Sequence, residues 1–188
     1  MAYELSGLAR TIGKPLCILD TETTGLLRDP VVGLVEFASL TIFPDGTHAR
    51  DSLLLNPGIP IPWQASRVHG LIDEDVANEK RFPEIYAKVQ SIFNDCIVCG
   101  FNSREYDVPV LQSNANRYQL GALNALNQLD VRDVWIAHSR AQRGKLSVVA
   151  EYYGVQPGTA HRAGGDVETT VGVLRAMVQQ HGADFVLG

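Results

Sequence analysis

A short apolar run, Leu16 to Leu19, is followed directly by Asp20-Thr21-Glu22, which carries two acidic residues. Consecutive apolar residues followed by a break at Gly25 predict a buried strand. Side chains at positions i and i+2 of a strand point to the same face, so both carboxylates can approach one cation. Two like charges at the end of a buried strand repel each other strongly unless a cation lies between them. The sequence therefore predicts a ligand site at the carboxyl end of this strand, where α/β folds place ligands.

The remaining elements follow from hydrophobic spacing and turn signals. Two longer runs, 34–43 and 47–55, are separated by Pro44-Asp45-Gly46 and predict an antiparallel hairpin. Residues 1–14 are expected to be a loosely packed lead-in. Further strands are predicted at 97–101 and, as a short strand or helix lead-in, at 129–131, and helices at 64–68, 82–94, 108–120, 131–141, 146–153 and 166–181. This order predicts an α/β fold with an antiparallel hairpin at one edge and a parallel crossover half.

A second acidic segment runs from Gly100 to Asp107. The predicted strand 97–101 ends in this polar loop, and Asp107 stands just before Val108-Pro109. That position is typical of a helix N-cap with proline in the first turn. A carboxylate at such a position can also face a metal ion, so the two interpretations are compatible.

A third segment, His161-Arg162-Ala163-Gly164-Gly165-Asp166, lies near the carboxyl end of the chain. Asp166 is expected to open the last helix as its N-cap. His161 is expected in the preceding loop, where an imidazole that titrates near neutral pH can take a proton from water. A single histidine is also common as a packed or solvated side chain. Its five-residue spacing to an acid favours the functional interpretation.

Several other polar residues are open to a structural interpretation. Cys96 and Cys99 are expected to be buried structural cysteines, because a zinc site needs a second pair and only Cys17 remains. Glu36 lies inside an apolar strand and needs a partner, either a backbone group or an arginine near the site. Asp130 and Asp133 stand where a helix-start role suits at least one of them.

Length and composition limit the class of protein. A chain of 188 residues is expected to form one domain, with a core of about residues 15–180. The net charge of −5 argues against a broad basic surface, although bound cations would supply positive charge where a phosphate sits. No signal peptide or apolar run of membrane-spanning length is evident, and three cysteines favour a cytoplasmic setting. Scattered candidates for phosphate contacts are Arg28, Arg67, Arg104, Lys145 and Arg162.

Together these segments resemble the DEDDh group of 3′→5′ exonucleases, over about residues 16–177. That group includes the proofreading subunit of bacterial DNA polymerase III, exodeoxyribonuclease I, RNase T and oligoribonuclease. The motifs that carry the resemblance are LDTETTGL at 19–26, ASRVHGLIDEDV at 65–76, GFNSREYDVPVL at 100–111, KLSVVAEYYGV at 145–155 and HRAGGD at 161–166. Phe101 stands where many members have histidine, which is closer to the exodeoxyribonuclease I version of the second motif.

The resemblance implies a fold and a set of residue roles. The fold would be a ribonuclease-H-like mixed five-stranded sheet flanked by helices. Asp20, Glu22 and Asp166 would hold a first Mg²⁺ or Mn²⁺, and Asp20, with Asp107 directly or through water, would hold a second. His161 would deprotonate the attacking water. Contacts to the terminal nucleotide would come from Thr23, Thr24, Leu26 and Asn102, with His69 as a weaker candidate.

The leading hypothesis is a metal-dependent 3′→5′ exonuclease that acts on single-stranded DNA and releases nucleoside 5′-monophosphates. A 3′→5′ exoribonuclease is the alternative within the same chemistry. A catalytically silent module that binds nucleic acid or a partner is a third hypothesis from another class. A polymerase or repair partner is compatible with the first hypothesis, and no membrane association is expected.

Overall fold

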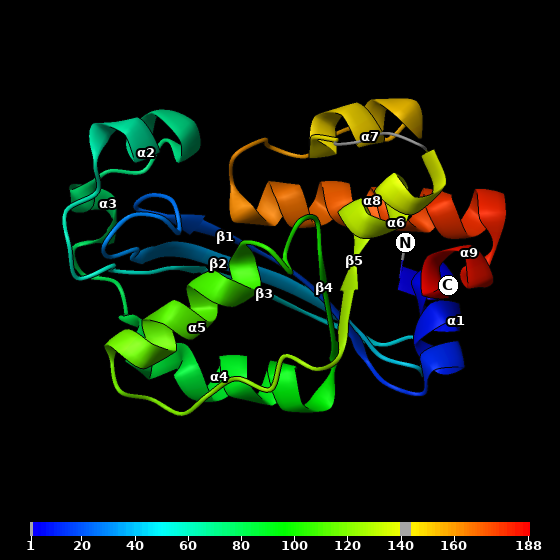
Figure 1. Ribbon diagram of the computed structural model, residues 1–188, viewed down its shortest axis with the longest axis horizontal. Coiled ribbons are helices and arrows are strands. Elements are labelled where there is room, and N and C mark those ends of the chain that lie inside the picture. Colours follow the sequence, from blue (N-terminus) through cyan, green and yellow to red (C-terminus); the bar gives the residue numbers. More distant parts are fainter. Residues whose placement is uncertain (1, 140–143) are drawn as a thin grey trace.

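Five strands form one mixed sheet in the order β3-β2-β1-β4-β5 (Figure 1). The computed structural model describes residues 2–139 and 144–188. β1 pairs antiparallel with β2 and parallel with β4, and β5 extends the parallel half. The predicted hairpin is β2 with β3, and the predicted mixed sheet is confirmed. The strands are β1 Leu16–Thr23, β2 Leu34–Ile42, β3 His48–Leu54, β4 Ile97–Gly100 and β5 Gln128–Asp130.

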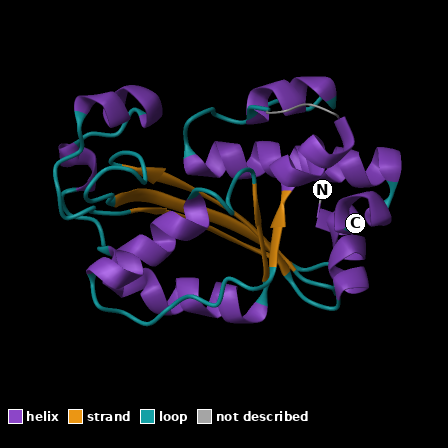
Figure 2. Ribbon diagram, in the orientation of Figure 1, coloured by secondary structure: helices purple, strands orange, loops and turns teal. Residues whose placement is uncertain are grey.

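Helices cover both faces of this sheet (Figure 2). α8 (Ala163–His181) packs on β1 and β2, together with α1 (Ala2–Ile12), α6 (Val131–Ser139), α7 (Leu146–Tyr152) and α9 (Ala183–Leu187). α4 (Phe82–Asp95) and α5 (Asp107–Arg117) cover the opposite face. The short helices α2 (Trp63–His69) and α3 (Asp73–Val76) follow β3. The core therefore has two main apolar layers separated by the sheet, and a smaller cluster formed by Val35, Ile61, Leu71 and Val76.

Alternation along β1 explains why acids end this strand. Leu16 and Ile18 are fully buried under the α8 layer, and Cys17 and Leu19 are buried on the α4 side. Continuing the same alternation places the next residues, Asp20 and Glu22, on the α8 face. The strand thus runs from a dry core into a polar end, where α8 begins.

Two predictions were wrong, one about residues 1–14 and one about the start of α8. Residues 1–14 are not a loose lead-in, because α1 packs Leu5, Leu8 and Ala9 into the core with essentially no exposed surface. α8 begins at Ala163, three residues before the predicted start at Asp166. The predicted helix 131–141 is observed to Ser139, and its last residues lie outside the described ones.

Other structural interpretations are confirmed. Cys17, Cys96 and Cys99 are buried and free, and burial raises the pKa of Cys17 to about 12. Asp130 accepts the backbone N–H of Arg132 in the first turn of α6 at 3.0 Å, as a helix-start residue does. Among the described residues, no helix is long and apolar enough to span a bilayer.

Candidate active site

Three carboxylates meet where β1 ends and α8 begins. Asp20 and Glu22 come from β1, and Asp166 comes from the first turns of α8. One carboxylate oxygen of each residue can be chosen so that all three atoms lie within 4.8 Å of one another. All three side chains are half-buried. The fold therefore joins the first and third acidic segments, which are separated by most of the chain.

This crowding changes the acidity of the group. Burial, followed by the charges of Asp107, Asp166 and Glu22, raises the pKa of Asp20 well above its ordinary value. Burial and then the charge of Asp166 raise the pKa of Glu22 to about 8. Burial also raises the pKa of Asp166. Without a cation, the cluster holds protons that a solvated carboxyl group would have lost at neutral pH.

Asp107 lies beside this cluster rather than inside it. Its side chain is 3% exposed, and its Oδ1 accepts the Thr21 hydroxyl at 2.6 Å. Burial raises the pKa of Asp107 to about 6, and its charge is in turn the second largest cause of the raised pKa of Asp20. The N-cap of α5 is Tyr106, so the predicted N-cap position of Asp107 is wrong by one residue.

His161 lies in the loop that leads into α8, and its side chain is exposed. Its backbone N–H donates to Asp166 Oδ2 at 3.2 Å. The prediction that Asp166 is the N-cap of α8 is wrong, because Arg162 occupies that position. Asp166 instead lies one turn into the helix, and its side chain contacts the preceding loop. His161 has a φ of 57°, a left-handed conformation that costs a non-glycine residue of the order of 1–2 kcal/mol. The surrounding contacts must hold it there.

The loop after β1 contains three of the predicted substrate contacts. The Thr23 hydroxyl donates to the Gly25 carbonyl at 2.7 Å and contacts the Tyr106 hydroxyl at 2.6 Å. The Thr24 hydroxyl accepts the Gly33 N–H at 2.9 Å. Both threonine side chains are buried and brace the loop, whereas Leu26 is 49% exposed at its tip. Tyr106 was not anticipated, because nothing in the sequence links it to Thr23.

The two other predicted substrate contacts differ in exposure. His69 ends α2, is 4% exposed, and accepts the Leu71 N–H through Nδ1 at 3.1 Å. Burial lowers the pKa of His69. Asn102 is half-buried, and its side-chain carbonyl accepts a hydrogen bond from Arg132. Both side chains therefore have structural partners.

Glu36 has the partners that its position in a strand required. It is 2% exposed on β2, directly opposite Glu22 in the sheet register. Arg162 binds both of its carboxylate oxygens, and the Ala163 N–H donates to one of them. Both of the expected kinds of partner, a backbone group and an arginine, are thus confirmed. Arg104, another of the scattered phosphate candidates, is paired with Asp133.

The residues present fit a divalent cation. Carboxylate oxygens are the ligands that Mg²⁺ and Mn²⁺ prefer in proteins. Arg162 is the cation that lowers the pKa of Glu22, but its guanidinium is already paired with Glu36. The mutual repulsion of Asp20, Glu22 and Asp166 is therefore left for a bound cation to neutralise.

The raised pKa values predict how the metal-free protein responds to pH. Folded Glu22 titrates near pH 8 rather than 4.5, and folded Asp107 near pH 6 rather than 3.8. Between the unfolded and folded pKa values, the folded chain holds more protons than the unfolded chain. The free energy of unfolding of the metal-free protein therefore falls as pH rises from about 4 to 8.

Thermal unfolding in EDTA, followed by circular dichroism, measures this dependence. Mn²⁺ at about a hundred times its Kd should raise the unfolding midpoint at pH 8 by roughly 5 to 10 °C. The effect of Mn²⁺ should vanish near pH 4, where the acids are protonated. An unfolding midpoint that rises with pH in EDTA, or that ignores Mn²⁺ at pH 8, would contradict this description of the cluster.

Comparison with protein families gives one match across most of the chain. The profile of the family described as exonuclease matches residues 17–174. An uncharacterized exonuclease of Escherichia phage 186 is 29% identical over 174 residues, which cover 86% of this chain and 87% of that protein. The DNA polymerase III subunit epsilon of Treponema pallidum is 24% identical and covers 86% of this chain and 75% of that one.

Comparison with solved structures agrees on the fold. Escherichia coli exonuclease I in complex with a dA16 oligonucleotide superimposes with a TM-score of 0.77 at 16% identity. The match covers 92% of this chain but 42% of the other, so this chain spans about two-fifths of that protein. The predicted ribonuclease-H-like sheet flanked by helices is confirmed.

Proposed function

Because this chain belongs to the exonuclease family, as the match across residues 17–174 shows, we propose that it removes nucleotides from the 3′ end of single-stranded DNA. The predicted enzyme class, a 3′→5′ exonuclease of the DEDDh type, is confirmed by this membership. One observation carries the proposal for this particular chain: the acids Asp20, Glu22 and Asp166, remote in sequence, form one cluster in which carboxylate oxygens, one from each residue, lie within 4.8 Å of one another. The products would be nucleoside 5′-monophosphates.

The carboxylates would act as ligands for two divalent cations, Mg²⁺ or Mn²⁺. Asp20, Glu22 and Asp166 would hold one ion, and Asp20 with Asp107 would hold the other. Bound there, the ions would supply Lewis acidity to the scissile phosphate and lower the pKa of water. The structure of Escherichia coli exonuclease I with single-stranded DNA in a zinc-bound form supports a divalent cation in this fold.

The residues around the ligands would position the reacting groups. His161 would accept the proton of the attacking water, which its exposed side chain and its backbone contact with Asp166 allow. The Thr21 hydroxyl holds the Asp107 carboxylate in one orientation through its 2.6 Å hydrogen bond. A carboxylate oriented by such a bond loses less entropy when a ligand arrives.

The loop after β1 would receive the terminal nucleotide. Tyr106 also donates to the Gly25 carbonyl at 2.8 Å, so the loop is braced at its turn. The exposed Leu26 then presents an apolar surface on which a base can pack. Thr23, Thr24, His69 and Asn102 would line the same subsite and shape it through the contacts described above.

DNA is proposed as the preferred substrate because structural neighbours were solved with DNA. Two structures of Escherichia coli exonuclease I hold dA16 and dT13 oligonucleotides. Among the relatives, the Treponema pallidum protein is a DNA polymerase subunit. An exoribonuclease remains the alternative, since no residue described above reads the 2′-hydroxyl group that distinguishes RNA.

Matched 5′-labelled DNA and RNA oligonucleotides of one sequence test the proposal. With Mg²⁺ or Mn²⁺ we expect a ladder that shortens from the 3′ end and nucleoside 5′-monophosphates as products. DNA should be degraded at least about tenfold faster than RNA, a difference of 1.4 kcal/mol in transition-state stabilisation. Equal or faster RNA cleavage would transfer the assignment to the alternative, and binding without cleavage in either metal would favour a silent module.

The biological setting is proposed more broadly. We propose that the 188 residues act as one exonuclease domain, in a reducing cytoplasmic setting that suits three free cysteines. A polymerase or repair partner is supported by the name of the Treponema pallidum relative. Co-purification with a tagged copy of the chain, with and without nuclease treatment of the lysate, would test whether such a partner binds directly.

A further inference from the structure

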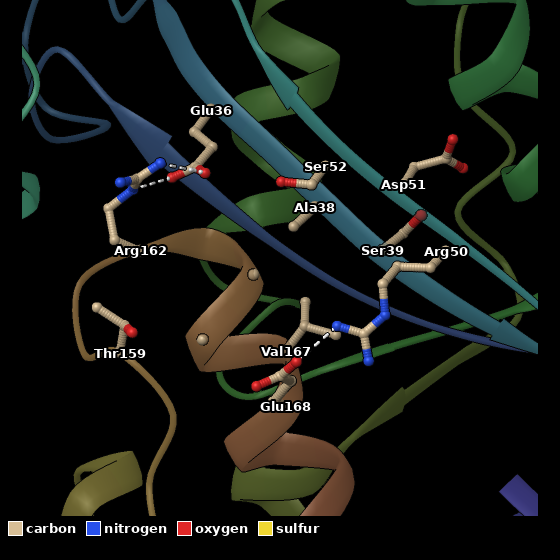
Figure 3. Close-up of a pocket in the computed structure, with 12 residues that line it drawn as sticks. Glu36, Ala38, Ser39, Arg50, Asp51, Ser52, Thr159, Arg162, Val167 and Glu168 are labelled. Atoms are coloured by element: carbon tan, nitrogen blue, oxygen red, sulfur yellow. Dashed lines mark hydrogen bonds and ion pairs between the residues drawn. The ribbon is translucent and has the colours of Figure 1, made fainter.

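The start of α8 is held by ion pairs as well as by close packing. A cavity of about 320 Å³ lies between β2, β3 and the first turns of α8 (Figure 3). Two ion pairs cross this region: Arg162 with Glu36, and Arg50 with Glu168. The second pair is about half exposed at both ends, so it contributes little to stability. The first pair, Arg162 with Glu36, differs because its carboxylate is buried.

Glu36, in the interior of the sheet, makes a bidentate contact with Arg162. Arg162 Nε donates to Glu36 Oε2 at 2.9 Å, and Arg162 Nη2 donates to Oε1 at 3.0 Å. The Ala163 N–H also donates to Oε2 at 3.2 Å. Bidentate contacts of this kind fix orientation as well as distance. Because the Glu36 side chain is 3% exposed, its position is set by β2, and it imposes that position on the two residues that follow His161.

The part of the loop that precedes His161 is also held in place, by contacts with α8. The Gly158 N–H donates to the Thr169 hydroxyl at 2.9 Å, and that hydroxyl donates to the Gly165 carbonyl at 2.8 Å. Gly165 lies so close to the loop that a Cβ atom there would stand 2.1 Å from the Thr159 carbonyl oxygen. His161 therefore lies between two anchored points, in a left-handed conformation that an untethered loop would not keep.

We propose that Glu36 is a positioning residue for His161, acting through Arg162 and the Ala163 N–H to hold the imidazole over the acidic cluster. This inference rests on the proposed function, because it assigns the purpose of the contact to proton transfer from the attacking water. Glu36 itself would touch neither substrate nor cation. Its carboxylate is engaged by the three hydrogen bonds given above.

Two variants with opposite effects on charge separate position from electrostatics. Glu36→Gln removes a negative charge beside the cluster, and Arg162→Gln removes a positive one. If the contact acts by placing His161, both variants should lower kcat by about 10- to 100-fold, because misplacement of a reacting group by 1 Å has that effect. In Glu36→Gln, KM for the oligonucleotide should change less than about twofold, since Glu36 contacts no substrate. The half-saturating Mn²⁺ concentration should move in opposite directions in the two variants, because they change the charge beside the cluster in opposite senses.

A double-mutant cycle with His161→Ala identifies the residue through which Glu36 acts. In the His161→Ala background, Glu36→Gln should have almost no further effect, because the group that it positions is gone. The exposed ion pair between β3 and α8 provides the control: Arg50→Gln and Glu168→Gln should leave kcat within about twofold of the wild type. Arg162→Gln also covers the case in which Glu36→Gln fails to fold, since the Arg162 side chain is 41% exposed.

The outcomes are distinguishable. Loss of kcat in both variants, absent in the His161→Ala background, supports the inference. Three results would overturn it: opposite changes of kcat in the two variants, a shift in Mn²⁺ dependence without a change in kcat, or an equal loss of kcat in the wild-type and His161→Ala backgrounds. If the wild-type chain does not shorten a 3′ end at all, the proposed function fails first. If the wild type is active and Glu36→Gln matches it, only the positioning role fails.

Discussion

Replacing Asp20 with asparagine should lower the cleavage rate by about four orders of magnitude, equivalent to roughly 5.5 kcal/mol of transition-state stabilisation. Asp20 is central to the cluster, because its pKa is raised first by burial and then by the charges of Asp107, Asp166 and Glu22 together. It is also the residue proposed to serve both cations. The change keeps the shape of the side chain but removes the charge that a cation requires. Single-turnover cleavage of a 5′-labelled oligonucleotide in Mn²⁺ measures the effect.

A matched control for this variant is Asp133→Asn. Asp133 is also an aspartate near a strand end, but it is paired with Arg104 and has a side chain 48% exposed. We expect cleavage within about twofold of wild type from this control, as for most exposed pairs. Asp20→Asn should also stabilise the metal-free protein at pH 8, because it removes one of several repelling charges. Activity within tenfold of the wild type would exclude Asp20 as a shared ligand.

Replacing His161 with alanine should lower kcat by about 10²- to 10⁴-fold, the usual contribution of a general base. The exposed imidazole contributes little to folding, so the unfolding midpoint should change by no more than a few degrees. The carboxylates remain in place, and stabilisation of the protein by Mn²⁺ should persist. Cleavage kinetics and thermal unfolding of the same preparation, with and without Mn²⁺, separate these effects.

His48→Ala is the control for loss of an exposed histidine, since His48 begins β3 at the sheet edge. It should behave as the wild type in both measurements. An His161→Ala variant that keeps full activity would place the proton acceptor elsewhere. A variant that is inactive only because Mn²⁺ no longer stabilises it would give His161 a role in shaping the metal site instead.

The sheet could be predicted because its signals are local. The alternation that continues from Leu16 to Glu22 determines which side chains enter the core and which face α8. The hairpin turn at Pro44 to Gly46 links β2 and β3 in the predicted antiparallel pair. The glycines that end α2 and α7, Gly70 and Gly154, have the positive φ that such helix ends require. These features depend on a few neighbouring residues each.

The errors arose where distant contacts overrule local patterns. α1 forms because Leu5 and Leu8 find a core built by β2 and α8, which its own sequence does not reveal. α8 starts at Ala163 despite Gly164 and Gly165, which disfavour a helix locally. Glu36 accepts the N–H of Ala163 and thereby extends the helix toward the loop. An interaction across 127 residues cannot be read from spacing.

The acidic cluster was the most predictable part of the site, and its supports were the least. Strand alternation and the resemblance to a family together pointed to Asp20, Glu22 and Asp166. Thr21 and Tyr106, which orient Asp107 and the loop after β1, gave no signal in the sequence. Glu36 gave a partial one, because an acid inside an apolar strand demands a partner.

We propose that these carboxylates bind divalent cations at the point where a nucleic-acid 3′ end is cleaved. The most direct measurement is anomalous scattering from a crystal soaked in Mn²⁺, together with cleavage assays on the same preparation. We predict manganese peaks within coordination distance of Asp20, Glu22 and Asp166. In Asp20→Asn, both these peaks and the cleavage activity should be lost. Cleavage of DNA by a protein whose crystals show no manganese among these side chains would contradict the account.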